Sequence, residues 1–106
     1  MEDAVSVLLF TAASAEEVAR IGKALVEEGL AACVNVVPGV RSVYRWEGRL
    51  CDDAEALGIV KARRDAVQAV TARIRSLHTA KVPEVVALDV MGGNPDYLSW
   101  VMGVRK

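Results

Sequence analysis

The sequence is poor in the residues that bind transition metals. It has one histidine and two cysteines among 106 residues. Cys33 and Cys51 have no CxxC spacing, and no cluster supplies the two or more nitrogen or sulfur ligands that copper or zinc normally requires. Two widely separated cysteines do not make a disulfide framework, so we expect reduced thiols in the cytoplasm.

Other absences exclude whole classes of protein. A formal net charge of −1 and a pI near 5.8 lack the basic surplus of a protein that binds nucleic acid. The start of the chain is acidic where a signal peptide is basic, and its apolar run is far shorter than a membrane span. GxSxG, P-loop and GxGxxG motifs are absent, so we expect no enzyme. A content of 53% hydrophobic residues predicts one globular domain over residues 1–106.

Apolar periodicity predicts a strand followed by a helix at the start of the chain. Residues 4–11 are rich in Val and Leu, with the continuous hydrophobicity typical of a strand covered on both faces. Ser14 and Glu17 stand at capping-box spacing before apolar residues at helical intervals. Gly29 is a typical helix end, so the first helix lies between Ser14 and Gly29.

The middle of the chain has the pattern of one long hairpin. Residues 30–46 and 49–63 form the two arms, and Glu47-Gly48 forms the turn between them. Pro38-Gly39 interrupts the first arm, which predicts a bulge or bend near a sheet edge.

The last third of the chain again alternates between helix and strand patterns. Asp65 is the predicted cap of a second helix with Gln68 at its third position, and residues 84–91 form a fourth strand. Asn94 and Pro95 open a short terminal helix. The order is strand, helix, strand, strand, helix, strand and a short C-terminal helix, which predicts an α+β, ferredoxin-like βαββαβ sandwich with helices on one face of a four-stranded sheet.

The hairpin is longer than the helices that could cover it. A helix of about fifteen residues spans roughly 22 Å, whereas an arm of about fourteen residues spans roughly 46 Å. A two-residue turn places Tyr44 and Trp46 on one face of the protruding ribbon. An isolated ribbon is only marginally stable, so we expect a second copy of the chain to cover it. The alternative is a hairpin folded back on its own sheet at Pro38-Gly39.

Several segments of the chain follow one another in a specific order: LVEEGLAACVNVVPGVRSVYRWEGRL, the later Glu55 and Lys61, VPEVVAL and GNPDYLSW. In this order and spacing they resemble the CutA family of divalent-ion tolerance proteins. The resemblance implies a ferredoxin-like subunit in a homotrimer, whose long hairpins form inter-subunit sheets. We expect Tyr44, Trp46 and Trp100 at the trimer interface.

The resemblance also implies a role in tolerance of copper and other divalent metals, with no established reaction. Proposed copper ligands of bacterial members lie at the ends of the first strand and the second helix. Phe10, which cannot ligate a metal, holds the first position, and His78 holds the second. The family's Pro-Tyr-Glu after that histidine is replaced by residues 79–81, Thr-Ala-Lys.

The densest group of metal donors lies in the second arm of the hairpin. Cys51, Asp53 and Glu55 share one face of a regular strand. With His78, and with ligands contributed by neighbouring chains, they form the site that we expect for copper(II) or another divalent cation. The alternative is that the carboxylates are a solvated strand edge and that His78, in the last turn of a helix, is structural.

A second functional interpretation remains open. A PII-like trimeric sensor or scaffold would bind a small anion or a partner protein in the clefts between subunits, through Arg45, Arg49, Lys61 and Lys81. Metal binding should depend on His78, whereas anion binding should depend more on Lys61. Cys33 is expected to be a small buried hydrophobe.

Overall fold

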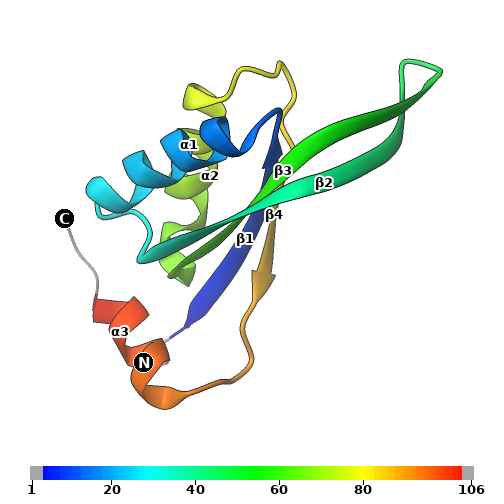
Figure 1. Ribbon diagram of the computed structural model, residues 1–106. Coiled ribbons are helices and arrows are strands. Elements are labelled where there is room, and N and C mark those ends of the chain that lie inside the picture. The colour runs from blue at the N-terminus through cyan, green and yellow to red at the C-terminus, as the bar shows by residue number, and fades with distance from the viewer. Residues whose placement is uncertain (1–3, 104–106) are drawn as a thin grey trace.

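The computed structural model describes residues 4–103 as a four-stranded antiparallel sheet with helices on it (Figure 1). The sheet order is β2-β3-β1-β4, and this confirms the predicted ferredoxin-like α+β fold. The elements in chain order are β1 (Val5–Ala12), α1 (Ala15–Glu27), β2 (Cys33–Trp46), β3 (Arg49–Arg63), the 3-10 turn η1 (Arg64–Ala66), α2 (Val67–Leu77), β4 (Val85–Asp89) and α3 (Pro95–Gly103).

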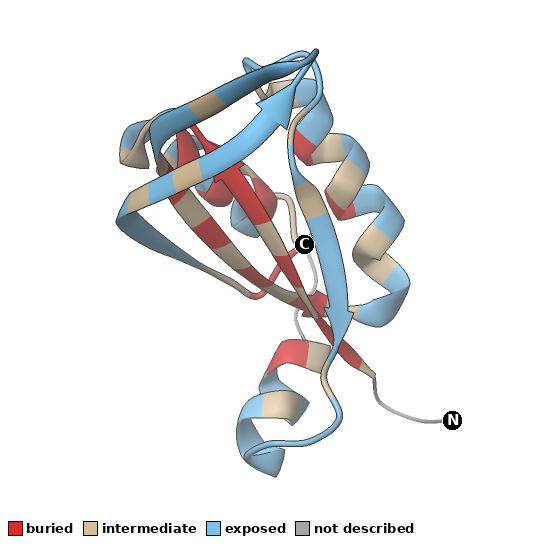
Figure 2. Ribbon diagram, turned by 90° about the vertical axis from the view of Figure 1, so that its right-hand side faces the viewer, coloured by how far each residue is buried: buried red, intermediate tan, exposed pale blue. Residues whose placement is uncertain are grey.

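One face of the sheet carries the main core. Leu8, Phe10 and Val60 project from β1 and β3 toward α1 and α2, and none of them is exposed to solvent. Fully burying one such side chain stabilises the fold by about 1.5–3 kcal/mol. In Figure 2 the buried residues lie along β1, the adjoining part of β3 and the inner sides of the helices.

Phe10 explains why β3 has a glycine at its centre. Gly58 is the cross-strand partner of Phe10, and a Cβ at Gly58 would overlap the Phe10 ring. The aromatic ring therefore occupies the space above the glycine. Phe10 is a core residue in this chain.

The opposite face of the sheet is covered only at one end. There α3 packs Val101 against Val5, and Arg63 donates a hydrogen bond to the carbonyl of Met102 at 2.8 Å. Val7 and Leu9 in the middle of β1 are only half-buried on this face, so the prediction that β1 is covered on both faces is wrong for the single chain. We call this surface the helix-free face.

The hairpin of β2 and β3 has the predicted turn and bulge. Glu47 and Gly48 both have positive φ, as a two-residue hairpin turn requires. The register shifts between Val37 and Val40, and Gly39 in this bulge has a φ of 76°. The hairpin projects beyond the helices and does not fold back on its own sheet (Figure 1). The fold-back alternative is therefore wrong.

Some predicted boundaries are also wrong. Asp65 does not cap the second helix; Ala66 holds the N-cap position, because Arg63 binds the Asp65 carboxylate at 2.8 Å. His78 follows α2 with extended backbone and is not in its last turn. The second strand begins at Cys33, later than predicted, and the fourth is the shorter segment Val85–Asp89.

Candidate functional site

A groove of about 560 Å³ lies between the hairpin and the loop that joins α2 to β4. Tyr44, Trp46 and Glu55 line it from the hairpin, and His78 and Lys81 line it from the loop. The sequence predicted all five as functional residues, although it assigned them to three different roles. The remaining lining residues are Thr11, Ser42, Val43, Ala80, Val82, Pro83 and Glu84.

The imidazole of His78 is held by hydrogen bonds on both ring nitrogens. Its Nδ1 accepts a hydrogen bond from the backbone N–H of Ala80 at 2.9 Å, so Nδ1 carries a lone pair. Its Nε2 therefore carries the proton and donates to the carbonyl of Thr11 at 2.7 Å. The side chain is 4% exposed, and the arrangement assigns a neutral ring in one tautomer.

A buried carboxylate anchors the first turn of the same loop. Glu17 in α1 accepts hydrogen bonds from the backbone N–H of Thr79 at 3.0 Å and from its hydroxyl at 2.9 Å. Burial raises the pKa of Glu17, but the hydrogen bonds from the backbone N–H and the hydroxyl of Thr79 outweigh it and hold the pKa below its ordinary value. The charged carboxylate thus fixes Thr79 and, through it, the wall of the groove.

The predicted metal donors of β3 share one face, as expected from their alternation. Cys51, Asp53 and Glu55 lie opposite Tyr44, Ser42 and Val40 in the register. The hydroxyl of Tyr44 donates to the Asp53 carboxylate, and this bond raises the pKa of Tyr44 to about 12. Glu55 and His78 line the groove, but Cys51 and Asp53 do not.

Within residues 4–103 no group of three or more His, Cys, Asp or Glu side chains is close enough to hold a metal ion. A single subunit therefore brings together only part of the predicted ligand set. Any complete site of this kind needs ligands from a neighbouring subunit or a rearrangement of the groove. Cys51 and Cys33 are both free thiols.

The four predicted cations are not in one place. Lys81 lines the groove and has no hydrogen-bond acceptor among the described residues. Arg45 donates to the carbonyl of Gly48 at 3.3 Å, and Arg49 lies opposite Trp46 near the hairpin tip. Lys61 lies farther along β3 on the helix-free face, where it donates to the side chain of Asn35.

The aromatic side chains of the predicted interface are exposed in the single chain. Tyr44, Trp46 and Trp100 are between 42% and 52% exposed. Trp100 packs against Tyr97 in α3, with ring centroids 5.7 Å apart. Cys33 is half-buried, not buried as expected; it lies opposite Lys61 in the register and beside Tyr97 of α3.

Sequence reasoning missed the residues that position His78. Thr11 and Glu17 lie 67 and 62 positions away from the groups they bind. Glu17 was interpreted only as part of a helix cap, and no local pattern predicts a contact over that separation. The Ser14 cap itself is confirmed, since its hydroxyl accepts the Glu17 N–H at 3.1 Å.

The fold, the long hairpin and the groove together define a ferredoxin-like protein with a candidate ligand site between its hairpin and the loop that joins α2 to β4. Residues 6–104 match the sequence profile of the CutA1 divalent ion tolerance protein family. The chain belongs to this family, as its sequence predicted.

Bacterial and plant relatives share most of the chain. The divalent-cation tolerance protein CutA of Thermus thermophilus is 52% identical over 96 residues, which cover 90% of this chain and 92% of that protein. The solved structure from the same organism has a TM-score of 0.88 at 47% identity and covers 92% of this chain and 94% of its own. The CutA1 crystal structure from Oryza sativa has a TM-score of 0.93 at 40% identity, over 98% and 95% of the two chains.

The chain spans about half the length of the plant and animal relatives it matches. The chloroplastic CutA 1 protein of Oryza sativa is 44% identical over 90% of this chain but only 54% of its own length. A solved relative from Archaeoglobus fulgidus is described as periplasmic. Relatives therefore occupy different compartments. Among the described residues no helix has the length and hydrophobicity needed to cross a membrane.

Proposed function

We propose that this chain acts in the response to divalent cations as a non-enzymatic, cytoplasmic homotrimer that binds copper(II). Membership of the divalent ion tolerance family supports the cation role. The two free thiols support a reducing compartment. The hydrogen bonding of His78 is the observation that carries the metal assignment.

A histidine that ligates a metal usually donates its second ring N–H to a carbonyl or carboxylate, which fixes the tautomer. His78 has this arrangement, with Nε2–H bound to Thr11 and the lone pair of Nδ1 directed toward the groove loop. A metal ion would take the place of the Ala80 N–H on Nδ1. The net stability of that one hydrogen bond is about 1 kcal/mol, so a metal bond can replace it.

Carboxylates would complete the coordination. Glu55 and Glu84 line the groove with His78, and neither has a hydrogen-bond or ion-pair partner among the described residues. Cys51 and Asp53 lie on the same strand face as Glu55 and would be supplied by a neighbouring subunit. A nitrogen ligand with carboxylates suits copper(II), zinc and other divalent ions.

The helix-free face supports the homotrimer. Its central side chains are apolar and half-buried or exposed, and the exposed Tyr44 and Trp46 continue this surface into the hairpin. Patches of this kind mark sites of protein association. The central residues are Val7, Leu9, Leu57, Ile59, Val86 and Leu88.

Native mass spectrometry of the protein titrated with Cu(II) and Zn(II) tests assembly and metal binding together. We expect a trimer of the 11.4 kDa chain that takes up metal in whole-number steps. His78→Ala should weaken uptake at least tenfold, because it removes the only imidazole ligand. Glu55→Gln should weaken it less.

Glu16→Gln is the matched control, because Glu16 is an exposed carboxylate of α1 outside the groove. It should bind metal as the parent protein does. A trimer that remains metal-free at micromolar metal, or equal uptake by the His78→Ala variant, would contradict the metal assignment. A monomer would contradict the homotrimer.

The unpartnered ammonium of Lys81 favours a second candidate function, a sensor that binds a small anion in the groove. Arg45 and Arg49 near the hairpin tip and Lys61 farther along β3 do not line the groove. Calorimetric titration with anionic metabolites distinguishes the two functions. Loss of binding in Lys81→Ala with unchanged binding in Lys61→Ala would place the anion in the groove, whereas the opposite result would place it on the helix-free face.

A further inference from the structure

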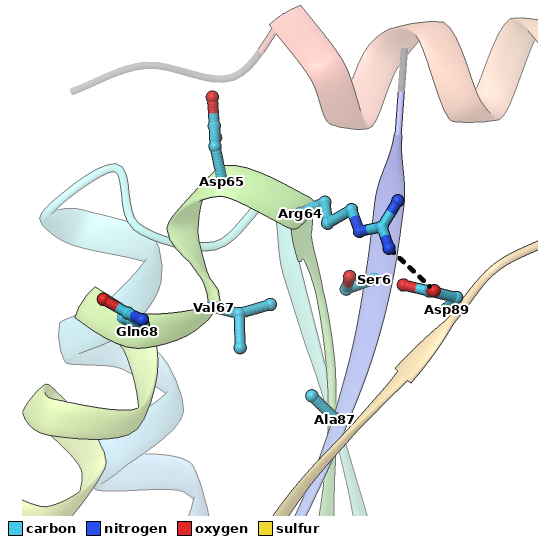
Figure 3. Close-up of a pocket in the computed structure, with 7 residues that line it drawn as sticks. All are labelled: Ser6, Arg64, Asp65, Val67, Gln68, Ala87 and Asp89. Atoms are coloured by element: carbon cyan, nitrogen blue, oxygen red, sulfur yellow. Dashed lines mark hydrogen bonds and ion pairs between the residues drawn. The ribbon is translucent and has the colours of Figure 1, made fainter. Parts of the chain in front are cut away.

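A second cavity, of about 500 Å³, lies at the opposite end of the sheet from the groove. It is bounded by the first turn of α2 on one side and by β1 and β4 on the other (Figure 3). Val67 and Ala87 supply apolar walls. Arg64 from η1 reaches over β1 toward Asp89 of β4, and Ser6 lies beside this pair.

Ser6 points to a ligand in this cavity. The residue is 2% exposed, and it lines the cavity, so the small remaining exposure is toward it. Within residues 4–103 no other group forms a hydrogen bond with its hydroxyl. Among the described residues no enclosed side-chain nitrogen or oxygen lacks a partner, so the Ser6 hydroxyl is open to the cavity, where a bound polar group can hydrogen-bond to it.

The cavity presents one positive group, the guanidinium of Arg64. Asp65 in the first turn of η1 offsets the dipole of the helical segment that begins there. Arg64 uses only one of its terminal nitrogens, Nη2, on Asp89, at 3.1 Å, and guanidinium has five N–H donors. Both partners of this ion pair are more than 60% exposed, so the pair is weak and can rearrange.

The cavity also presents a negative group. Asp89 is the cross-strand partner of Ser6, and its carboxylate lies at the same wall. Asp65 lines the cavity too, but its carboxylate is bound by Arg63. A simple anion would be repelled by Asp89, and a simple cation by Arg64. A ligand with both charges fits both groups.

We propose that this cavity binds a small zwitterion of the α-amino-acid class. Its carboxylate would accept hydrogen bonds from Ser6 and Arg64, which lie side by side in Figure 3. Its ammonium would bind Asp89, and an apolar side chain would contact Val67 and Ala87. The volume is sufficient for a ligand of this size. The proposal is independent of the metal function, because the two sites share no residue.

Amide chemical-shift titrations with three matched probes test the proposal on the whole chain. L-valine carries both charges, isobutyrate only the carboxylate and isobutylamine only the ammonium. We expect saturable shifts of the Ser6, Val67 and Gln68 amides with L-valine, and binding at least tenfold weaker with either single-charge probe, since each lacks one charged hydrogen-bonded pair.

Variants localise the effect. Ser6→Ala and Arg64→Gln should each weaken L-valine binding about tenfold, since each removes a donor to a charged group. Ser6→Ala removes only one oxygen atom and Arg64 is exposed, so both variants should fold, as thermal unfolding will check. Arg75→Gln is the control, because Arg75 is an exposed arginine of α2 outside the cavity.

Three outcomes would overturn the proposal. The first is no saturable shift with L-valine at tens of millimolar. The second is binding of isobutyrate as tight as that of L-valine, which would make the cavity an anion site. The third is unchanged binding in both Ser6→Ala and Arg64→Gln. None of these outcomes bears on metal uptake at the groove.

Discussion

The two halves of the β2-β3 hairpin have similar strand sequences but opposite environments. In the half beneath α1 and α2, Val60 and Ala62 are fully buried and pair with β1. In the projecting half, Val43 and Leu50 are more than 60% exposed. The molecule extends 46 Å along its longest axis and only 25 Å and 22 Å along the others. One half of the hairpin is thus stabilised by its own chain, and the other half needs a partner.

The comparison predicts where a mutation changes the stability of the chain and where it changes assembly. A side chain of the buried half contributes to the folding of each subunit. A side chain of the projecting half contributes mainly when another copy covers it. The same kind of substitution should therefore have different consequences in the two regions.

The largest change in stability is expected in the core that packs against the buried half of the hairpin. Phe10→Ala should lower the free energy of unfolding by about 3–5 kcal/mol, because it leaves a cavity above Gly58 where the ring is fully buried. Denaturant unfolding at one fixed protein concentration measures this, since the stability of an oligomer depends on concentration. Val26→Ala on the exposed side of α1 should change it by less than about 1 kcal/mol.

An equal loss of unfolding free energy in Phe10→Ala and Val26→Ala would contradict the comparison. The buried half of the hairpin would then not depend on the core that packs against it. Gly58→Ala gives a second test. Its new Cβ meets the Phe10 ring, so it should destabilise the parent chain by about 1–3 kcal/mol. The cost should fall when Phe10 is already alanine, and an additive double mutant would contradict the direct contact.

The next effect belongs to the projecting half. Replacing Tyr44 and Trp46 together with serine should shift the proposed trimer toward monomer at micromolar concentration, because aromatic anchors dominate most interfaces and each is worth about 2 kcal/mol or more. Sedimentation velocity measures the mass distribution. Val26→Ser, which removes an exposed apolar side chain from α1, is the control and should keep the parent mass.

Full oligomeric mass in the doubly substituted protein would show that the aromatics are not interface anchors. The secondary structure should persist in either case, because neither residue contacts the buried core of β1, α1 and α2. Loss of the fold itself would mean that the hairpin stabilises the subunit directly, which is the reverse of the comparison drawn above.

Local signals predicted most of the fold because their causes are local. Ser14, Gly39 and Asn94 were interpreted correctly, since a cap, a bulge and a helix entry each depend on neighbours within a few residues. Asp65 was interpreted incorrectly because Arg63, two residues away, binds the same carboxylate. Residue type alone does not decide which of two local partners binds a side chain.

The candidate site was predicted only in part, because its geometry depends on long-range contacts. His78 was identified from its position in a family pattern, but its two hydrogen bonds involve Thr11 and Ala80 on different elements. Alternation placed Cys51, Asp53 and Glu55 on one face correctly. Alternation does not tell which of them faces the loop after α2: Glu55 lines the groove and Cys51 does not.

A smaller effect is expected at the carboxylate that joins α1 to the groove loop. The pKa of Glu17 is lower in the folded chain than in the unfolded chain, so its stabilisation is present above the unfolded value and is lost as pH falls through the folded value. Glu17→Gln should cost about 1–3 kcal/mol at neutral pH. The difference from the parent should shrink below about pH 4.5.

Thermal unfolding of both proteins at neutral and acidic pH measures the effect. Glu16→Gln, one residue earlier and exposed, should leave the pH profile unchanged. If the parent protein and the Glu17→Gln variant differ in stability by the same amount at pH 7 and at pH 3, the carboxylate charge does not stabilise the loop.

The smallest effect is expected in the projecting half, at Tyr44. Its pKa of about 12 arises mainly from the hydrogen bond to the Asp53 carboxylate, which favours the neutral phenol. The sign is opposite to that of Glu17: the contribution is present below the unfolded pKa and is lost as pH rises through the folded value. Because both groups lie on an exposed ribbon, stability should hardly change, and only the titration should report the bond.

Ultraviolet titration of tyrosinate in a Tyr97→Phe background isolates Tyr44, since these are the two tyrosines of the chain. Asp53→Asn should return its pKa toward the ordinary value near 10, and Asp52→Asn, on the other face of β3 and bound to Arg41, should not. If the two variants titrate alike, the Tyr44–Asp53 bond does not form in solution. The Asp53 carboxylate would then be free to bind another subunit or a cation.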